Sequence, residues 1–185
     1  LLSEATAHLS KALELAPQLA GNYLNMGAAY QHDGRLDDAL HLYQHALTAP
    51  QITTTDRGEA YMDQAAVLVM QGRMSDAEAA LRQALEVNPR SAMAAFRLGG
   101  VEAREGRLPD ARRWYEQAVT WDETMNEARY ALARTEAQMG DLQAAATQVS
   151  LLTGASPEDP EVRAAVAAMA RSAAGGSTTA SRPAP

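Results

Sequence analysis

The sequence predicts an all-α fold built from repeated helix–turn–helix hairpins. Four segments align, and their glycines are separated by 38, 34 and 34 residues. The flanks of each segment place apolar residues at three- and four-residue intervals, the period of an amphipathic helix. Aromatic residues make up only 5% of the chain and alanine is abundant, which favours thin, closely packed helices over a sheet. The aligned segments are DGRLDDA from Asp33, QGRMSDA from Gln71, EGRLPDA from Glu105 and MGDLQAA from Met139.

Each repeated unit is expected to contain a helix, a short glycine turn and a second helix. Glycine is favoured just beyond a helix C-terminus, because it adopts the left-handed conformation without strain. Pro109 falls in the first turn of a following helix, where its missing N–H costs nothing. The turn glycines are Gly34, Gly72, Gly106 and Gly140.

The first and third complete units contain the residues of a known repeat. The first has Tyr23, Met26, Gly27, Tyr30, Gly34, Ala39, Tyr43 and Ala46, and the third has Leu98, Gly99, Gly106, Ala111, Tyr115 and Ala118. This pattern resembles the tetratricopeptide repeat (TPR), which has a period of ~34 residues and a W-x₂-L-G-x₂-Y…A-x₃-F…P signature. The resemblance implies a right-handed α-solenoid of TPR helix-turn-helix hairpins with a C-terminal capping helix.

The expected organisation is a TPR array over residues 1–174, followed by a disordered tail or linker over residues 175–185. An array of this kind is stabilised only between neighbouring repeats, so a single repeat is not expected to fold alone. The array divides into a half repeat (1–19), four repeats (20–53, 58–91, 92–125 and 126–159) and a capping helix (160–174).

Four positions depart from the repeat pattern. Residues 54–57 are a polar insertion, which we expect to loop out at one edge of the array. Gln64 replaces a core leucine and is expected to need a hydrogen-bond partner. Glu102 and Glu136 replace a tyrosine, and we expect their carboxylates to reach the rim of a groove.

The formal net charge of −7 argues against binding to nucleic acid or to anionic membrane surfaces. Cysteine is absent, which excludes disulfides and thiolate metal ligands but fits both cytoplasm and periplasm, so localisation stays open. No apolar run approaches the ~20 residues of a membrane helix. Because the chain begins with Leu1 inside a helical pattern, we expect it to be a segment of a longer protein.

The resemblance implies that the first helix of each repeat lines a concave, peptide-binding face. Asp63 makes the second repeat acidic there, whereas arginines make the third and fourth repeats basic. We therefore expect a peptide or protein partner with an apolar anchor and an acidic group. In the alternative interpretation the arginines pair with nearby carboxylates and only solubilise the surface. The candidate groove residues are Asn25, Met62, Asp63, Met93, Phe96, Arg97, Gly100, Arg104, Tyr130 and Arg134.

Two adjacent glycines lie inside one of the predicted helices. Gly99 matches the packing glycine of the repeat, but Gly100 does not, and glycine inside a helix costs ~1 kcal/mol relative to alanine. Gly100 could open a hollow for a ligand side chain, or it could only allow tight packing.

Some TPR proteins hold the carboxyl terminus of a chaperone with lysines, asparagines and an arginine. Arg97 matches such an arginine, but the lysines are missing, since Lys11 is the only lysine in the chain. The sequence therefore argues against binding of a chaperone tail.

The sequence contains no pattern typical of an enzyme, neither G-x-S-x-G nor a phosphate-binding loop. His41 and His45 lie four residues apart and could face one metal ion, but a solvent-facing pair on an outer helix is the favoured interpretation. No catalytic residue, metal or cofactor is expected.

The sequence thus predicts a protein–protein interaction module. One alternative is the TPR arm of a larger enzyme, for example a membrane-bound, glycosyltransferase-like protein, in which the repeats recruit a substrate or partner. Another is self-association through the N-terminal half repeat, where Leu1, Leu2 and Leu9 lack a partner helix.

Overall fold

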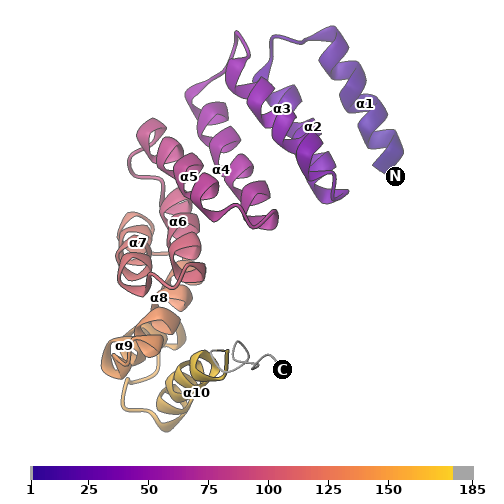
Figure 1. Cartoon of the computed structure of the whole chain (residues 1–185). Coiled ribbons are helices and arrows are strands. Elements are labelled where there is room, and N and C mark those ends of the chain that lie inside the picture. The colour runs from indigo at the N-terminus through magenta and orange to yellow at the C-terminus, as the bar shows by residue number, and fades with distance from the viewer. Residues whose placement is uncertain (1, 177–185) are drawn as a thin grey trace, which may run out of the picture. The chain divides into compact units, whose positions relative to one another are not determined.

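The structure, a computed structural model, describes residues 2–176, and these residues form ten α-helices (Figure 1). They include no β-strand, so the all-α prediction is confirmed. No helix among them is long and apolar enough to cross a membrane. In chain order the helices are α1 (Leu2–Leu15), α2 (Ala20–His32), α3 (Leu36–Thr48), α4 (Thr54–Met70), α5 (Met74–Val87), α6 (Ala92–Arg104), α7 (Leu108–Trp121), α8 (Asn126–Gln138), α9 (Leu142–Thr153) and α10 (Pro160–Gly176).

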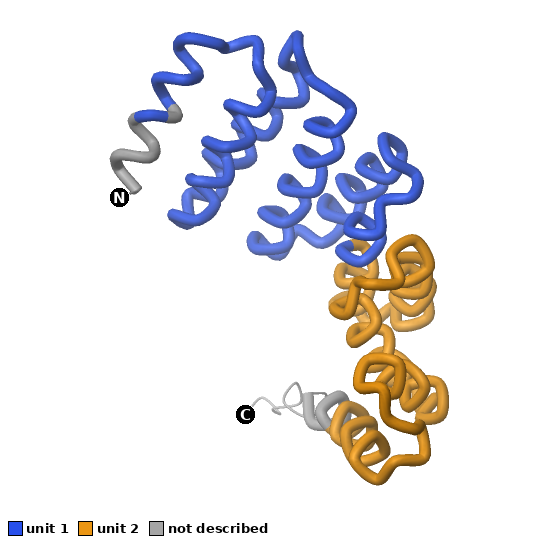
Figure 2. Tube along the Cα trace, turned by 180° about the vertical axis from the view of Figure 1, so that it is seen from behind, with its two compact units in different colours: residues 1–97 blue, residues 98–185 orange. Residues whose placement is uncertain are grey.

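The chain divides into two compact units, residues 1–97 and residues 98–185 (Figure 2). In the first unit each helix from α1 to α4 packs on the one that follows it, and α2 also contacts α4. In the second unit α7 packs on α8, α8 packs on α9, and α10 packs on both α8 and α9. Helix α6 begins in the first unit and ends in the second. Contacts between near neighbours in sequence are typical of a repeat protein.

The four predicted glycine turns share one geometry. Gly34, Gly72, Gly106 and Gly140 have φ angles of 76°, 75°, 75° and 85°, in the left-handed region. In each turn the following residue donates its N–H to the carbonyl oxygen five positions earlier, at 2.9 Å. This is the Schellman arrangement, which satisfies a carbonyl left unpaired at a helix end.

A tyrosine ring packs directly on a helical glycine in each unit. The ring of Tyr43 lies over Gly27, and the ring of Tyr115 lies over Gly99. A Cβ atom added to Gly27 would be 2.5 Å from Tyr43 Cε1, and one added to Gly99 would be 2.7 Å from Tyr115 Cε1. Both tyrosines are almost completely buried. The small residues therefore set how closely the two helices of a hairpin approach.

Helix α10 covers the last hairpin of the second unit. Its Val162 and Val166 are buried against Val149 and a group of alanines from α8 and α9. The helix extends through Gly175 to Gly176. Residues 177–185 of the predicted tail lie outside the described residues, as do the side chains of Leu1, Leu2 and Leu9.

The prediction that residues 54–57 form a loop is wrong, because these residues form the first turn of α4. Thr53 Oγ1 accepts a hydrogen bond from the Asp56 N–H at 3.0 Å, and the Asp56 carboxylate accepts one from the Thr53 N–H at 3.2 Å. This reciprocal capping box satisfies two N–H groups at the helix end. The insertion therefore lengthens α4 to 17 residues.

Replacing the cap, Thr53→Ala, is expected to lower the free energy of unfolding by about 1 kcal/mol, because the Asp56 N–H loses its acceptor. Urea denaturation followed by circular dichroism measures the change. Thr54→Ala is the matched control, since Thr54 is exposed and lies just inside the helix. Equal destabilisation by the two substitutions would contradict a capping role for Thr53.

Candidate peptide-binding surface

In the first unit, the structure brings three of the predicted groove residues together. Arg97 Nη1 donates a hydrogen bond to the Met62 carbonyl oxygen at 2.8 Å and lies 3.6 Å from Asp63 Oδ1. Burial raises the pKa of Asp63, and the nearby Arg97 opposes this shift. The pair is half-buried. The positive charge of Arg97 is therefore already compensated by Asp63, as in the alternative interpretation of the arginines.

A buried tyrosine lies close to this ion pair. The hydroxyl of Tyr43 donates to Gln31 Oε1 at 2.9 Å, and Gln31 Nε2 lies 3.8 Å from the sulfur of Met70. Burial and the negative charge of Asp63 raise the pKa of Tyr43, while Arg97 opposes them. Helices α2, α3, α4 and α6 thus contribute polar groups to one region of the first unit.

The remaining candidates in the first unit differ in exposure. Asn25 on α2 is exposed, and Met93 at the start of α6 is 41% exposed. Met62 and Phe96 are half-buried. An exposed methionine provides a flexible apolar contact that adapts to different partners.

In the second unit, two predicted groove arginines act electrostatically on the buried hydroxyl of Tyr115. Burial raises the pKa of Tyr115, and the charges of Arg134 on α8 and Arg104 on α6 act to lower it. Both arginines are exposed, and neither forms an ion pair with a carboxylate of the described residues. Their charges are therefore available to a ligand, unlike that of Arg97.

The other two candidates of the second unit lie on the same helices as these arginines. Tyr130, which is 50% exposed, precedes Arg134 by one helical turn. Gly100 precedes Arg104 by one turn, and a Cβ atom added to it would be 3.7 Å from the Tyr115 hydroxyl oxygen. That separation is an ordinary contact, so Gly100 is not required for packing as Gly99 is.

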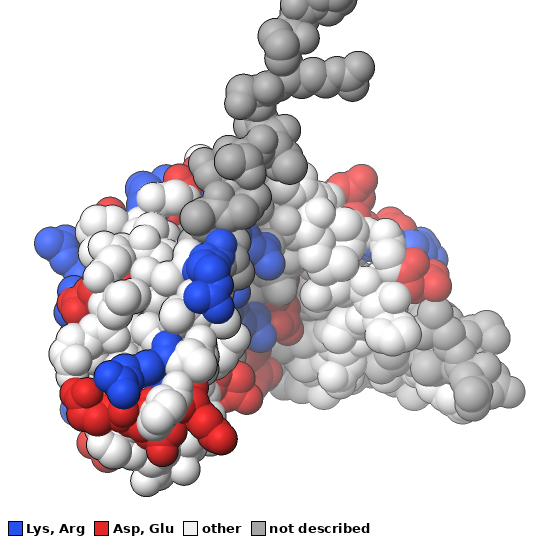
Figure 3. All heavy atoms as spheres, turned by 90° about the horizontal axis from the view of Figure 1, so that it is seen from below, with Lys and Arg blue, Asp and Glu red and all other residues white. Residues whose placement is uncertain are grey.

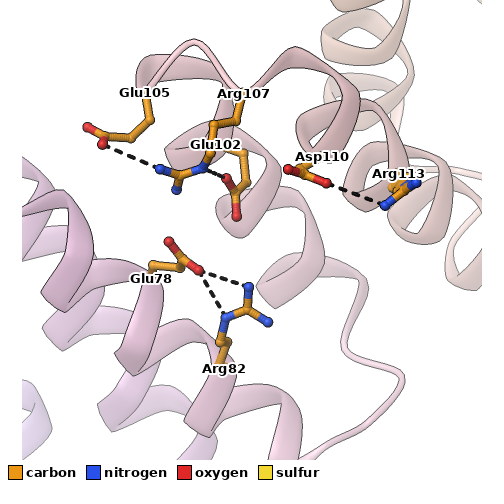
Figure 4. Close-up of polar contacts among 7 residues, drawn as sticks. All are labelled: Glu78, Arg82, Glu102, Glu105, Arg107, Asp110 and Arg113. Atoms are coloured by element: carbon orange, nitrogen blue, oxygen red, sulfur yellow. Dashed lines mark hydrogen bonds and ion pairs between the residues drawn. The ribbon is translucent and has the colours of Figure 1, made fainter.

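The prediction that Glu102 and Glu136 reach a groove rim is wrong, since each is only 2% exposed. Glu102 forms an ion pair with Arg107, the residue after the turn glycine, and Arg107 also lies 3.5 Å from Glu105 (Figure 4). A buried carboxylate needs such compensation, because leaving water disfavours its charge. In the third repeat Arg107 provides this compensating charge.

Glu136 lies at the same repeat position but lacks this partner, because Asp141 replaces the turn arginine. Arg112 Nε on α7 lies 3.8 Å from Glu136 Oε1, but Arg112 is shared with Glu116 at 2.8 Å and Asp141 at 3.7 Å. Glu136 Oε2 has no hydrogen-bond partner among the described residues. Burial raises the pKa of Glu136 to about 7, Arg112 opposes the shift, and Asp141 and Glu116 add to it.

The first unit also contains two surface hollows, of about 380 and 320 Å³. The larger lies between the first turns of α4 and the connection from α5 to α6. The smaller is lined by Gln44, Gln64 and Arg73 among others. Gln64 is half-buried there, so the prediction that it occupies a polar core position is wrong.

The two histidines of α3 do not lie in a cluster of potential metal ligands. His41 and His45 are exposed, and the ring of His45 stacks on that of Tyr23 with centroids 5.7 Å apart. Residues that the structure describes form no group of three or more potential metal ligands.

On the described part of the face in Figure 3, basic side chains lie beside acidic ones without a continuous basic surface.

Comparison with protein families identifies the repeat. Three models, each described as a tetratricopeptide repeat, match residues 18–90, 62–126 and 102–169. The chain belongs to the tetratricopeptide repeat family. The overlapping matches run without a gap through all four predicted TPR units and into α10.

Curated relatives of this TPR chain include the photosystem I assembly protein Ycf3 of two Synechococcus strains. The protein of strain CC9605 is 30% identical and that of strain WH7803 is 31% identical, each over 104 residues. The match covers 52% of this chain and 60% of each relative, so it spans only about three fifths of the relatives' length.

Solved TPR structures share the fold. MamA has a TM-score of 0.69 at 22% identity, covering 81% of this chain and 85% of its own. YrrB, described as a TPR protein with an unusual peptide-binding site, has a TM-score of 0.64 at 24% identity, covering 89% of this chain and 82% of its own. Pseudomonas aeruginosa PilF has a TM-score of 0.74 at 18% identity, covering 94% of this chain and 80% of its own. At these identities the likeness supports the fold alone.

Proposed function

We propose that this TPR chain is an interaction module that binds a polypeptide segment, and that Arg104 and Arg134 of the second unit hold an acidic group of that segment. The observation behind the proposal is that both arginines are exposed, make no ion pair with a described carboxylate, and both act electrostatically on the Tyr115 hydroxyl. A guanidinium group pairs bidentately with a carboxylate, which gives both affinity and orientation.

The surroundings of these arginines favour a peptide over a small anion. Tyr130 is half-exposed one turn from Arg134, and aromatic rings that are partly exposed often anchor a protein interface. Gly100 is half-buried and has no side chain of its own, so its backbone is partly open. An extended chain could therefore contact both helices while its carboxylate reaches the arginines.

The relatives are consistent with a protein partner. Ycf3 is named for the assembly of photosystem I, and YrrB is described by its peptide-binding site. Because the match covers only part of Ycf3 and the likeness to YrrB is one of fold, these properties support the class of partner and not its identity. The enzyme-arm alternative and self-association through the N-terminal half repeat remain predictions that no comparison supports.

The charge reversal Arg104→Glu/Arg134→Glu is expected to weaken binding of acidic peptides at least about tenfold, because each charged hydrogen bond contributes roughly 1.5–3 kcal/mol. Peptides retained by the intact chain from a random library would be labelled and their affinities measured by fluorescence anisotropy. Arg97 is left unchanged, since its loss would also leave the half-buried Asp63 without its ion-pair partner.

Arg113→Glu is the control, because Arg113 is highly exposed on α7 and pairs with Asp110 (Figure 4). It should leave the affinity within about twofold, as expected for a surface charge outside the site. Undiminished binding by the Arg104/Arg134 variant would exclude an acid-binding role for these residues.

A further inference from the structure

The extra helical turn of α4 creates the larger hollow of the first unit. Thr54 and Thr55, from the inserted residues, form one side of it. Ser91 and Asn88, from the connection between α5 and α6, also line it, as do the apolar side chains of Met62 and Val87. The other turn-to-turn spacings in the sequence are 34 residues rather than 38. The insertion, and therefore this wall, is particular to the second repeat.

The electrostatics of the hollow favour a positive charge. Glu59 is the one charged residue among those that line it. Its side chain is exposed and forms no ion pair or hydrogen bond with another described residue. Helix α5 ends at Val87 beside the hollow, and a helix C-terminus carries partial negative charge. At the opposite side of the hollow, the partial positive charge at the N-terminus of α4 is already compensated by the carboxylate of Asp56 in its capping box.

We propose that this hollow binds a lysine or arginine side chain of the partner polypeptide. The aliphatic part of such a side chain would pack on Met62 and Val87, while its cationic end reaches Glu59 and the threonine hydroxyls. Lysine and arginine combine an apolar stem with a charged head, which matches an apolar surface next to a carboxylate. A purely apolar side chain would leave Glu59 without a partner, and an anion would be repelled.

This inference rests on the proposed function, because it requires a polypeptide partner. It concerns a different unit and the opposite charge, however, so the two sites can be tested separately. The test uses the intact chain and the peptides that it retains from a random library. Wild-type protein is expected to enrich one basic residue in these peptides.

Glu59→Gln is expected to weaken binding of a basic peptide about fivefold, and replacing the enriched lysine with norleucine should weaken it by a similar factor. Combining the two changes should cause little further loss, because both remove the same ion pair. Glu59→Lys should shift the selected residue from basic to acidic. Glu86→Gln is the matched control, since Glu86 is an exposed residue of α5 that does not line the hollow.

The possible failures can be distinguished. Two results would overturn this inference alone. One is that the peptides bind the wild type and Glu59→Gln with the same affinity. The other is that the losses of binding free energy from Glu59→Gln and from the norleucine substitution simply add when the two are combined. Loss of binding on reversing Arg104 and Arg134 with no dependence on Glu59 would leave the proposed function intact. A library from which the wild-type chain retains no peptide would overturn both.

Discussion

Gly99→Ala is expected to destabilise the second unit by about 2 kcal/mol, because alanine at this position overpacks the hairpin. The added Cβ would be 2.7 Å from Tyr115 Cε1 and 2.8 Å from Cδ1, well inside van der Waals contact. Tyr115 is only 2% exposed, so its ring cannot move aside without displacing other core residues. Urea denaturation monitored by circular dichroism would give the change in the free energy of unfolding.

Gly100→Ala provides a control one residue away in the same helix. Its Cβ would make an ordinary contact of 3.7 Å with the Tyr115 hydroxyl oxygen, and alanine is favoured over glycine in a helix by up to about 1 kcal/mol. The adjacent substitutions should therefore have opposite signs. In the first unit Gly27→Ala should resemble Gly99→Ala, because its Cβ would be 2.5 Å from Tyr43 Cε1. Equal effects at Gly99 and Gly100 would contradict this account of the packing.

The helical hairpins could be predicted from the sequence because their determinants are local. A glycine at each turn, a helical apolar period on both sides and small residues at matching places all indicate the same structure. The left-handed φ angle at Gly106 and the close approach at Gly99 follow from these residue types. Each repeat contacts mainly its neighbours, so little long-range information is needed.

The polarity of the inserted residues 54–57 predicted a loop, but these residues are helical. Their sequence, together with Thr53, nevertheless contains a capping signal, a threonine followed three residues later by an acid. In the structure this signal starts α4 one turn earlier. Capping chemistry therefore outweighed polarity, and the hollow beside Glu59 could not be anticipated without it.

The pairing of charges depends on contacts between repeats, which polarity alone does not reveal. Asp63 and Arg97 lie one repeat of 34 residues apart, at equivalent positions of adjacent inner helices. Gln71 and Asp37, also 34 residues apart, are joined by a 2.8 Å hydrogen bond. Comparing residues at this separation would have identified both pairs. It would also have distinguished Arg97, which is paired, from the unpaired Arg104 and Arg134.

The second large effect concerns pH. Glu136→Gln is expected to stabilise the chain by about 3 kcal/mol at pH 8, from a pKa raised by about 2.5 units at ~1.4 kcal/mol each. In the folded state the pKa of Glu136 is raised to about 7, from its ordinary value of 4.5. The stability from this group is therefore fully present below pH 4.5 and is lost as pH rises to about 7. Glutamine resembles the protonated acid, so the variant should nearly match the wild type at pH 4.5, exceed it increasingly up to about pH 7, and keep a nearly constant advantage from there to pH 8.

Glu102→Gln is the matched control, because Glu102 occupies the equivalent buried position one repeat earlier but pairs with Arg107. Removing its charge breaks that ion pair, so this substitution should destabilise the chain rather than stabilise it. Free energies of unfolding from urea titrations between pH 4.5 and 8 would compare the two variants. A constant difference between Glu136→Gln and the wild type across this range would exclude the titration of Glu136.

The cause of this pH dependence lies in the turn, where Asp141 replaces the arginine found at positions 35, 73 and 107. Asp141→Arg should therefore give Glu136 the partner that Arg107 gives Glu102, and it should remove the loss of stability between pH 4.5 and 7. The same change removes the hydrogen bond from the Ala144 N–H to Asp141 Oδ1, at a cost of about 1 kcal/mol. That cost is a constant offset between the two variants, so the slope of stability against pH separates the two effects. If the slope remains in Asp141→Arg, the acidic turn is not what leaves Glu136 uncompensated.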